Sequence, residues 1–158
     1  MLKFSLPFLL FSICVFNCAI ADEALNKHIL TAIETKNYIK NVSHKSDYRV
    51  GVIGDFQVDT VSSKLANSIV KLNAGEDLTA FDLIVVIDFD MAKSFDLPKT
   101  AKSDVILIGI NNACVVDGVC VLGIEERGSS FDILLNQEAS EKRNVFFDGT
   151  FLFTTKRV

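Results

Sequence analysis

Several residue types on which catalytic and binding sites are commonly built are scarce in this chain. It has two histidines, His28 and His44, and neither lies near a cysteine or an acid at the spacing of a metal site. The G-x-S-x-G nucleophile motif is missing, and so are the G-x-G-x-x-G and G-x-x-x-x-G-K-[ST] phosphate-binding spacings. We therefore expect structural histidines, no catalytic residues, no metal, no cofactor and a protein that is not an enzyme.

Clusters of lysine and arginine are also missing, and 16 basic against 20 acidic residues give a formal charge of −4. A protein that follows a phosphate backbone needs a basic surface, so nucleic acid is not an expected partner. No Pro-rich, Gly/Ser-rich or highly charged linker divides the sequence, and its length is typical of one domain. The sequence predicts a single domain over residues 22–158.

The first 21 residues have the composition of a secretory signal peptide. Lys3 provides a charged start, an apolar run extends from Phe4 to Phe16, and Ala19-Ile20-Ala21 is the A-x-A pattern of a signal peptidase site. A membrane anchor is the alternative, but the apolar run is shorter than the ~20 residues that span a bilayer. We expect cleavage after Ala21 and export to the periplasm or the extracellular space, with the mature chain not embedded in the membrane.

Cleavage would leave Cys114 and Cys120 as the only cysteines of the mature chain. An even pair in an exported protein indicates a disulfide, and Asp117-Gly118 between them is a turn signal that would bring the two sulfurs together. A disulfide that closes so short a loop would stabilise the fold by about 2 kcal/mol. The alternative is a pair of buried free thiols.

Hydrophobic periodicity predicts helices and strands that alternate along the chain. Helical spacing marks residues 22–40 and 58–72, and β-branched apolar runs mark strands within residues 48–53, 81–89 and 105–110. Apolar strands separated by helical or irregular crossovers indicate a parallel sheet covered by helices.

The pattern changes after the cysteines. Residues 119–124 and 130–135 have the composition of an antiparallel hairpin whose tip is Glu125-Glu126-Arg127, and a short helix over residues 137–143 and a Phe-rich end follow. The predicted fold class is therefore α/β, with a mostly parallel central sheet flanked by helices and a C-terminal antiparallel hairpin.

Two candidate ligand sites lie at the ends of the predicted strands. Gly51-Val52-Ile53-Gly54 ends a strand as a phosphate loop does, but a tight turn at Gly54 and Asp55 is the simpler interpretation. Asp82, Asp88 and Asp90 flank the central strand, where parallel sheets carry sites, but no base accompanies them. We favour solvated edge residues there, which leaves the ligand-binding residues unknown.

The C-terminal half follows a recognisable order of residues: Gly118-Val119-Cys120-Val121-Leu122-Gly123-Ile124, then Phe131-Asp132-Ile133-Leu134-Leu135-Asn136, then Ala139. Upstream, Tyr48-Arg49-Val50-Gly51-Val52-Ile53-Gly54-Asp55 is similar to a V-x-V-L-G-D strand. In this order the chain resembles the periplasmic YfiR-like family. It departs from that family where a Trp-Pro step is replaced by Lys40-Asn41-Val42-Ser43, and where an S-S-K-L-L-like helix is replaced by Asp148-Gly149-Thr150-Phe151-Leu152.

The resemblance implies a regulatory role. Members are periplasmic repressors, not enzymes, that bind the sensor domain of an inner-membrane diguanylate cyclase and so lower cyclic-di-GMP signalling and biofilm formation. It also implies a redox-sensitive bridge between Cys114 and Cys120 and self-association as a homodimer. The alternatives are a periplasmic small-ligand carrier or sensor with a pocket near Gly54, Asp88 and Ile110, and an envelope-assembly structural component that uses the Phe-rich end as an interface.

Overall fold

The computed structural model describes residues 23–40, 48–56, 69–95, 97 and 104–158. The expected signal peptide of residues 1–21, the loop with His44, and residues 58–68 of the helix expected over residues 58–72 lie outside this set. Within the described residues, no helix is both long enough and apolar enough to cross a membrane.

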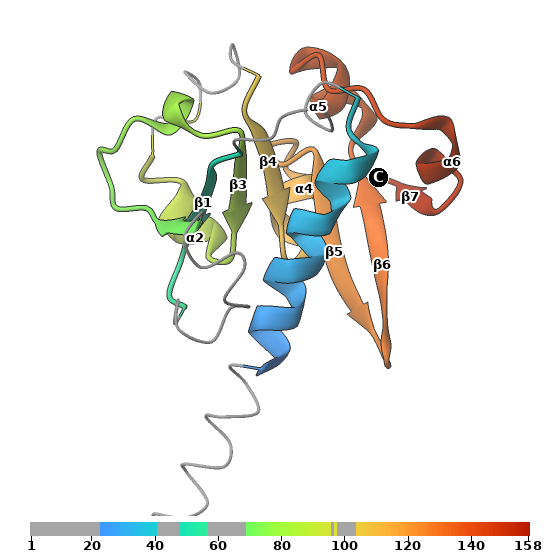
Figure 1. Ribbon diagram of the computed structural model, residues 1–158, viewed down its shortest axis with the longest axis horizontal. Coiled ribbons are helices and arrows are strands. Elements are labelled where there is room, and N and C mark those ends of the chain that lie inside the picture. The colour runs from blue at the N-terminus through green and yellow to red at the C-terminus, as the bar shows by residue number, and fades with distance from the viewer. Residues whose placement is uncertain (1–22, 41–47, 57–68, 96, 98–103) are drawn as a thin grey trace, which may run out of the picture.

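One mixed sheet organises the described part of the chain (Figure 1), with seven strands in the order β2-β1-β3-β4-β5-β6-β7. The strands β2, β1, β3, β4 and β5 run parallel to one another, β6 returns antiparallel to β5, and β7 lies parallel to β6. This arrangement confirms the predicted α/β class with its C-terminal hairpin. The strands are β1 (Val50–Ile53), β2 (Ile69–Lys71), β3 (Leu83–Val86), β4 (Ile106–Gly109), β5 (Leu122–Arg127), β6 (Ser130–Leu135) and β7 (Thr155–Arg157).

Both faces of the central strands are buried, which explains why their sequences are continuous apolar runs. Leu83 and Val85 pack into one core with the opening helix over residues 23–34, which crosses the sheet in Figure 1. Ile84 and Val86 pack into a second core on the other face, which includes residues of α2 (Phe89–Ala92) and α4 (Asn112–Val116). The period-two alternation along β3 thus assigns its side chains to two separate cores.

Two of the predicted helices have different bounds in the structure. The opening helix ends at residue 34 and continues as the 3-10 turn η1 (Thr35–Tyr38), because Ile39 adopts an extended conformation and pairs with Phe147. Residues 69–71, expected to be the end of a helix, form β2, which supplies the parallel partner of β1. Pairing with the neighbouring strand outweighs the local helical spacing there.

The hairpin β5–β6 is longer than its sequence indicated. Glu125, Glu126 and Arg127 were expected at the tip, but they belong to β5, and Arg127 pairs directly with Ser130. The loop consists of Gly128 and Ser129, and such a two-residue connection lets both strands pair to their ends.

The C-terminal segment forms three short elements after β6. They are α5 (Gln137–Lys142), α6 (Gly149–Leu152) and the edge strand β7. In the middle of the chain, the 3-10 turn η4 (Leu78–Ala80) precedes β3. Residues 148–152 were expected to replace a helix of the YfiR-like pattern, yet they form α6 because the Asp148 side chain caps it at the backbone N–H of Thr150. The strand β7 was not predicted.

Candidate functional site

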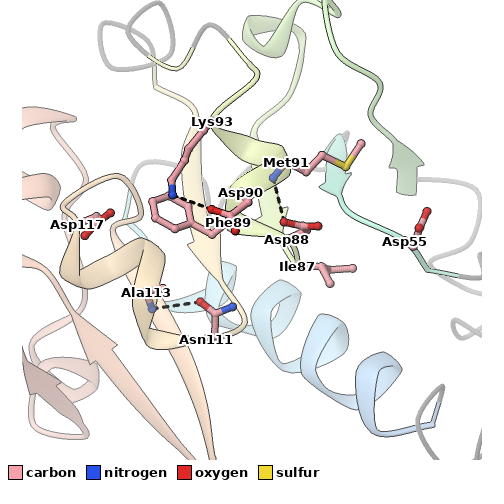
Figure 2. Close-up of a pocket in the computed structure, with 10 residues that line it drawn as sticks. All are labelled: Asp55, Ile87, Asp88, Phe89, Asp90, Met91, Lys93, Asn111, Ala113 and Asp117. Carbon is pink, nitrogen blue, oxygen red and sulfur yellow. Dashed lines mark hydrogen bonds and ion pairs between the residues drawn. The ribbon is translucent and has the colours of Figure 1, made fainter.

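The carboxyl ends of β1, β3 and β4 meet at one edge of the sheet and form an open pocket of about 700 Å³. The chain leaves β1 toward β2 on one side and then continues to β3 on the other, so the strand order reverses at this point. Such a switch point is the usual place for a ligand in an open α/β sheet. Figure 2 shows the lining side chains: Asp55, Ile87, Asp88, Phe89, Asp90, Met91, Lys93, Asn111, Ala113 and Asp117.

Local hydrogen bonds hold the polar side chains of this switch-point pocket. Asp88 caps α2, its Oδ1 accepting from the backbone N–H of Met91 at 2.9 Å, and Asn111 caps α4 in the same way through Ala113 at 3.1 Å (Figure 2). Gly54 has φ 129°, and a Cβ atom there would lie 2.7 Å from the Cβ of Ile87. Only glycine allows the backbone just after β1 to approach the residue that follows β3 so closely.

Electrostatics give the switch-point pocket an acidic character, because four carboxylates and one ammonium group line it. The hydrogen bond from Lys93 to Asp90, 2.7 Å long, holds the pKa of the carboxyl below its usual range and raises the pKa of the ammonium group. A hydrogen bond from Lys71 likewise lowers the pKa of Asp55. Lys93 also lies 4.7 Å from the centre of the Phe89 ring, so the protein's own cation occupies the aromatic face.

The aspartates that flank β3 do not form one cluster. Asp82 precedes β3 and accepts a hydrogen bond from the backbone N–H of Arg49 at 3.0 Å, whereas Asp88 and Asp90 follow β3 and line the switch-point pocket. His28 lies elsewhere, with Nδ1 2.7 Å from the carbonyl of Ala24 and its ring edge on Phe131. Among the described residues, no three His, Cys, Asp or Glu side chains are placed to hold a metal ion.

The predicted bridge between Cys114 and Cys120 is present, with a Cα–Cα distance of 5.2 Å. The expected turn at Asp117 and Gly118 is also present, and it follows directly on α4, which contains Cys114 and has Asp117 as its C-cap. Gly118 then adopts φ 72°, a left-handed conformation typical of a helix end, and the backbone N–H of Cys120 donates to the carbonyl of Cys114 at 3.0 Å. This turn at the end of the helix brings the two sulfurs together.

A second pocket, about 280 Å³ in volume, is lined mostly by residues of the C-terminal segment and is called here the C-terminal groove. Its floor consists of the buried side chains of Leu135, Val145 and Phe147, and its walls include Phe146 and Leu152, which are 56% and 36% exposed. Large apolar side chains left this accessible around a hollow are typical of an interaction surface. The remaining lining residues are Lys40, Gln137, Ser140, Glu141 and Arg157.

The phenylalanines of the Phe-rich end divide into buried and exposed side chains, a division that the sequence did not predict. Phe147 and Phe151 are buried and stack on each other, with ring centres 5.4 Å apart, whereas Phe146 and Phe153 point outward and Phe153 is 93% exposed. No periodicity separates adjacent phenylalanines of this kind. The isolated bridge between Ile39 and Phe147 decides which ring faces the core.

A scan against models of protein families finds no match to this chain, and a search of curated proteins finds none either. The similarity to the YfiR-like family therefore stays a prediction that depends on the residues quoted for it.

Proposed function

We propose that this chain is an exported regulatory protein that acts by binding another protein, and that its partner is the periplasmic sensor domain of an inner-membrane diguanylate cyclase. In this role it represses the cyclase and lowers cyclic-di-GMP. The choice of partner comes from the resemblance alone. The observation that supports a binding role is the C-terminal groove, where Phe146, Leu152 and the neighbouring Phe153 expose apolar surface.

Of the segments that carry the resemblance, the two C-terminal ones, residues 118–124 and 131–139, lie side by side in the fold and adjoin this surface. Asn136 follows β6 directly. Its Oδ1 caps α5 at the backbone N–H of Ala139, and its Nδ2 donates to the carbonyl of Val115 in α4 at 2.8 Å. A single side chain thus connects the hairpin, the helix beside the groove and the helix that holds the disulfide. A change at the bridge can therefore reach the groove through packed elements.

The test is intracellular cyclic-di-GMP in a bacterial strain in which this gene is deleted and then restored with variants. Deletion should raise cyclic-di-GMP, and the unaltered gene should lower it again. A Phe146→Ser/Phe153→Ser pair should fail to restore repression, because it removes exposed apolar surface and leaves the cores intact. His28→Ala and Asp88→Asn should restore it, since both lie outside the groove. An unchanged level on deletion, under resting and reducing conditions alike, would reject this function.

A small-ligand carrier or sensor is the second candidate, and the switch-point pocket favours it. Its volume of about 700 Å³ falls within the roughly 300–1,000 Å³ usual for small-molecule sites. Native mass spectrometry of the full chain isolated from cell envelopes should then reveal a bound small molecule, and Asp88→Leu or Asp90→Leu should reduce its occupancy. A spectrum that contains the protein mass alone would count against this candidate.

A further inference from the structure

We infer that the C-terminal groove binds a segment of a partner protein in which one large apolar side chain is flanked by carboxylates. The inference rests on the proposed function, because it specifies the chemistry of the partner that the regulatory role requires. The size of the groove, its charge and the ion pairs around it each support this kind of occupant.

The size of the groove suits an anchoring side chain better than a whole small molecule. Its volume of about 280 Å³ is just below the roughly 300–1,000 Å³ of small-molecule sites. The floor of Leu135, Val145 and Phe147 is already buried, so an incoming side chain would mainly cover Phe146 and Leu152. Interfaces commonly depend on such an anchor in a preformed apolar pocket.

The charge of the protein around the groove indicates which groups of the partner lie beside its apolar side chain. Residues 142–158 contain four basic residues and one acid, so this segment carries +3, while the whole chain carries −4 and the rest of it therefore −7. Two cationic residues, Lys40 and Arg157, line the groove, and its one acid, Glu141, accepts a hydrogen bond from Gln137 at 2.9 Å. An acidic segment would be attracted to this part of the protein and repelled by the remainder, which fixes where it docks.

The ion pairs nearby show which cations remain for a partner. Lys156 is paired with Asp132, and Lys142 is paired with Glu138 at 2.6 Å. Arg157 makes no ion pair within the described residues, and its guanidinium can donate two parallel hydrogen bonds to a carboxylate. Arg157, a cation that lines the groove, is thus not engaged by a carboxylate of the described residues.

An anionic membrane surface is the competing class of occupant, since exposed phenylalanine beside cations can also contact lipid headgroups. The overall charge of −4 opposes it, because a bilayer would face the whole protein whereas a peptide contacts the groove alone. We therefore assign the groove to a protein segment.

The experiment is a titration of the full chain, followed by two-dimensional NMR, with three end-blocked hexapeptides. The sequences are Glu-Glu-Ala-Phe-Glu-Glu, Lys-Lys-Ala-Phe-Lys-Lys and Glu-Glu-Ala-Ala-Glu-Glu. The first should bind saturably and shift the signals of Phe146 and Leu152, and the other two should bind at least tenfold more weakly. The Lys40→Glu/Arg157→Glu pair should reverse the preference between the acidic and basic peptides, whereas Lys71→Glu, on the opposite edge of the sheet, should not.

Three results would overturn the inference: no saturable binding of the acidic peptide, equal or tighter binding of the basic one, or an unchanged preference in the charge-reversed pair. Flotation of the chain with phosphatidylglycerol vesicles, lost in Phe153→Ser, combined with failure of the peptide, would assign the surface to lipid instead. The proposed function fails separately, if deletion leaves cyclic-di-GMP unchanged. If deletion raises cyclic-di-GMP and the Lys40→Glu/Arg157→Glu pair still represses fully, the function stands and the groove assignment is wrong.

Discussion

Loss of the Cys114–Cys120 bridge should destabilise the fold in two separable parts. The first is ring closure: a separation of 6 residues limits the entropy that the bridge removes from the unfolded chain to about 2 kcal/mol at 25 °C. Chemical reduction of the native protein isolates this part, because the two thiols keep their volume. Reduction should therefore lower the free energy of unfolding by about 2 kcal/mol and leave a folded protein.

The second part is packing, because both cysteines are fully buried in the core that includes Val115 and Leu107. Changing both cysteines to alanine removes the bridge and two buried sulfurs, which should add about 1 kcal/mol per site. The total loss for Cys114→Ala/Cys120→Ala is then about 4 kcal/mol. The serine pair should lose more, since each hydroxyl left without a partner in an apolar core costs about 1–3 kcal/mol.

Urea unfolding at 25 °C measures the free energy of unfolding of the oxidised, reduced, alanine and serine forms. Equal midpoints for the oxidised and reduced protein would refute the ring-closure argument. Equal stability of the alanine and serine pairs would refute the packing argument, because it would mean that the hydroxyls find partners or water.

Three further changes probe other features of the fold. Tyr48→Phe should raise the free energy of unfolding by about 1 kcal/mol, since the buried Tyr48 hydroxyl has no hydrogen-bond partner in the described residues; a lower urea midpoint would contradict this. Asn136→Ala should cost about 2 kcal/mol in the same assay, because it removes the cap of α5 and the bond to Val115; an unchanged midpoint would show that water replaces both. The hydrogen bond from Lys156, with Arg127 nearby, lowers the folded-state pKa of Asp132, so its contribution is present above about pH 4 and is lost as the pH falls through the folded pKa. Asp132→Asn should therefore lower the urea midpoint at pH 7, and the difference from the unaltered protein should shrink as the pH falls below about 4.

The sequence predicted the central strands well because their signal is local. Leu83, Ile84, Val85 and Val86 form an unbroken β-branched and apolar run, and such a run is stable only where both faces of a sheet are covered. The disulfide was predictable for a similar reason, since two cysteines close together in a sequence that begins like an exported one have few alternatives. The hairpin and the helix that begins after Asn136 followed from composition.

The edge strands and the groove were not predictable, because long-range contacts decide them. Ile69 fits a helical spacing, yet it pairs with Val50 of β1, since that strand would otherwise leave a row of backbone groups unpaired. Adjacent Phe146 and Phe147 have the same side chain and the same local propensity. Only the pairing of Ile39 with Phe147, more than 100 residues apart, turns one ring into the core and leaves the other at the rim of the groove. Sequence by itself thus determined the α/β class and the bridge, whereas tertiary pairing decided which apolar side chains remain at the surface, because exposure depends on what the rest of the chain covers.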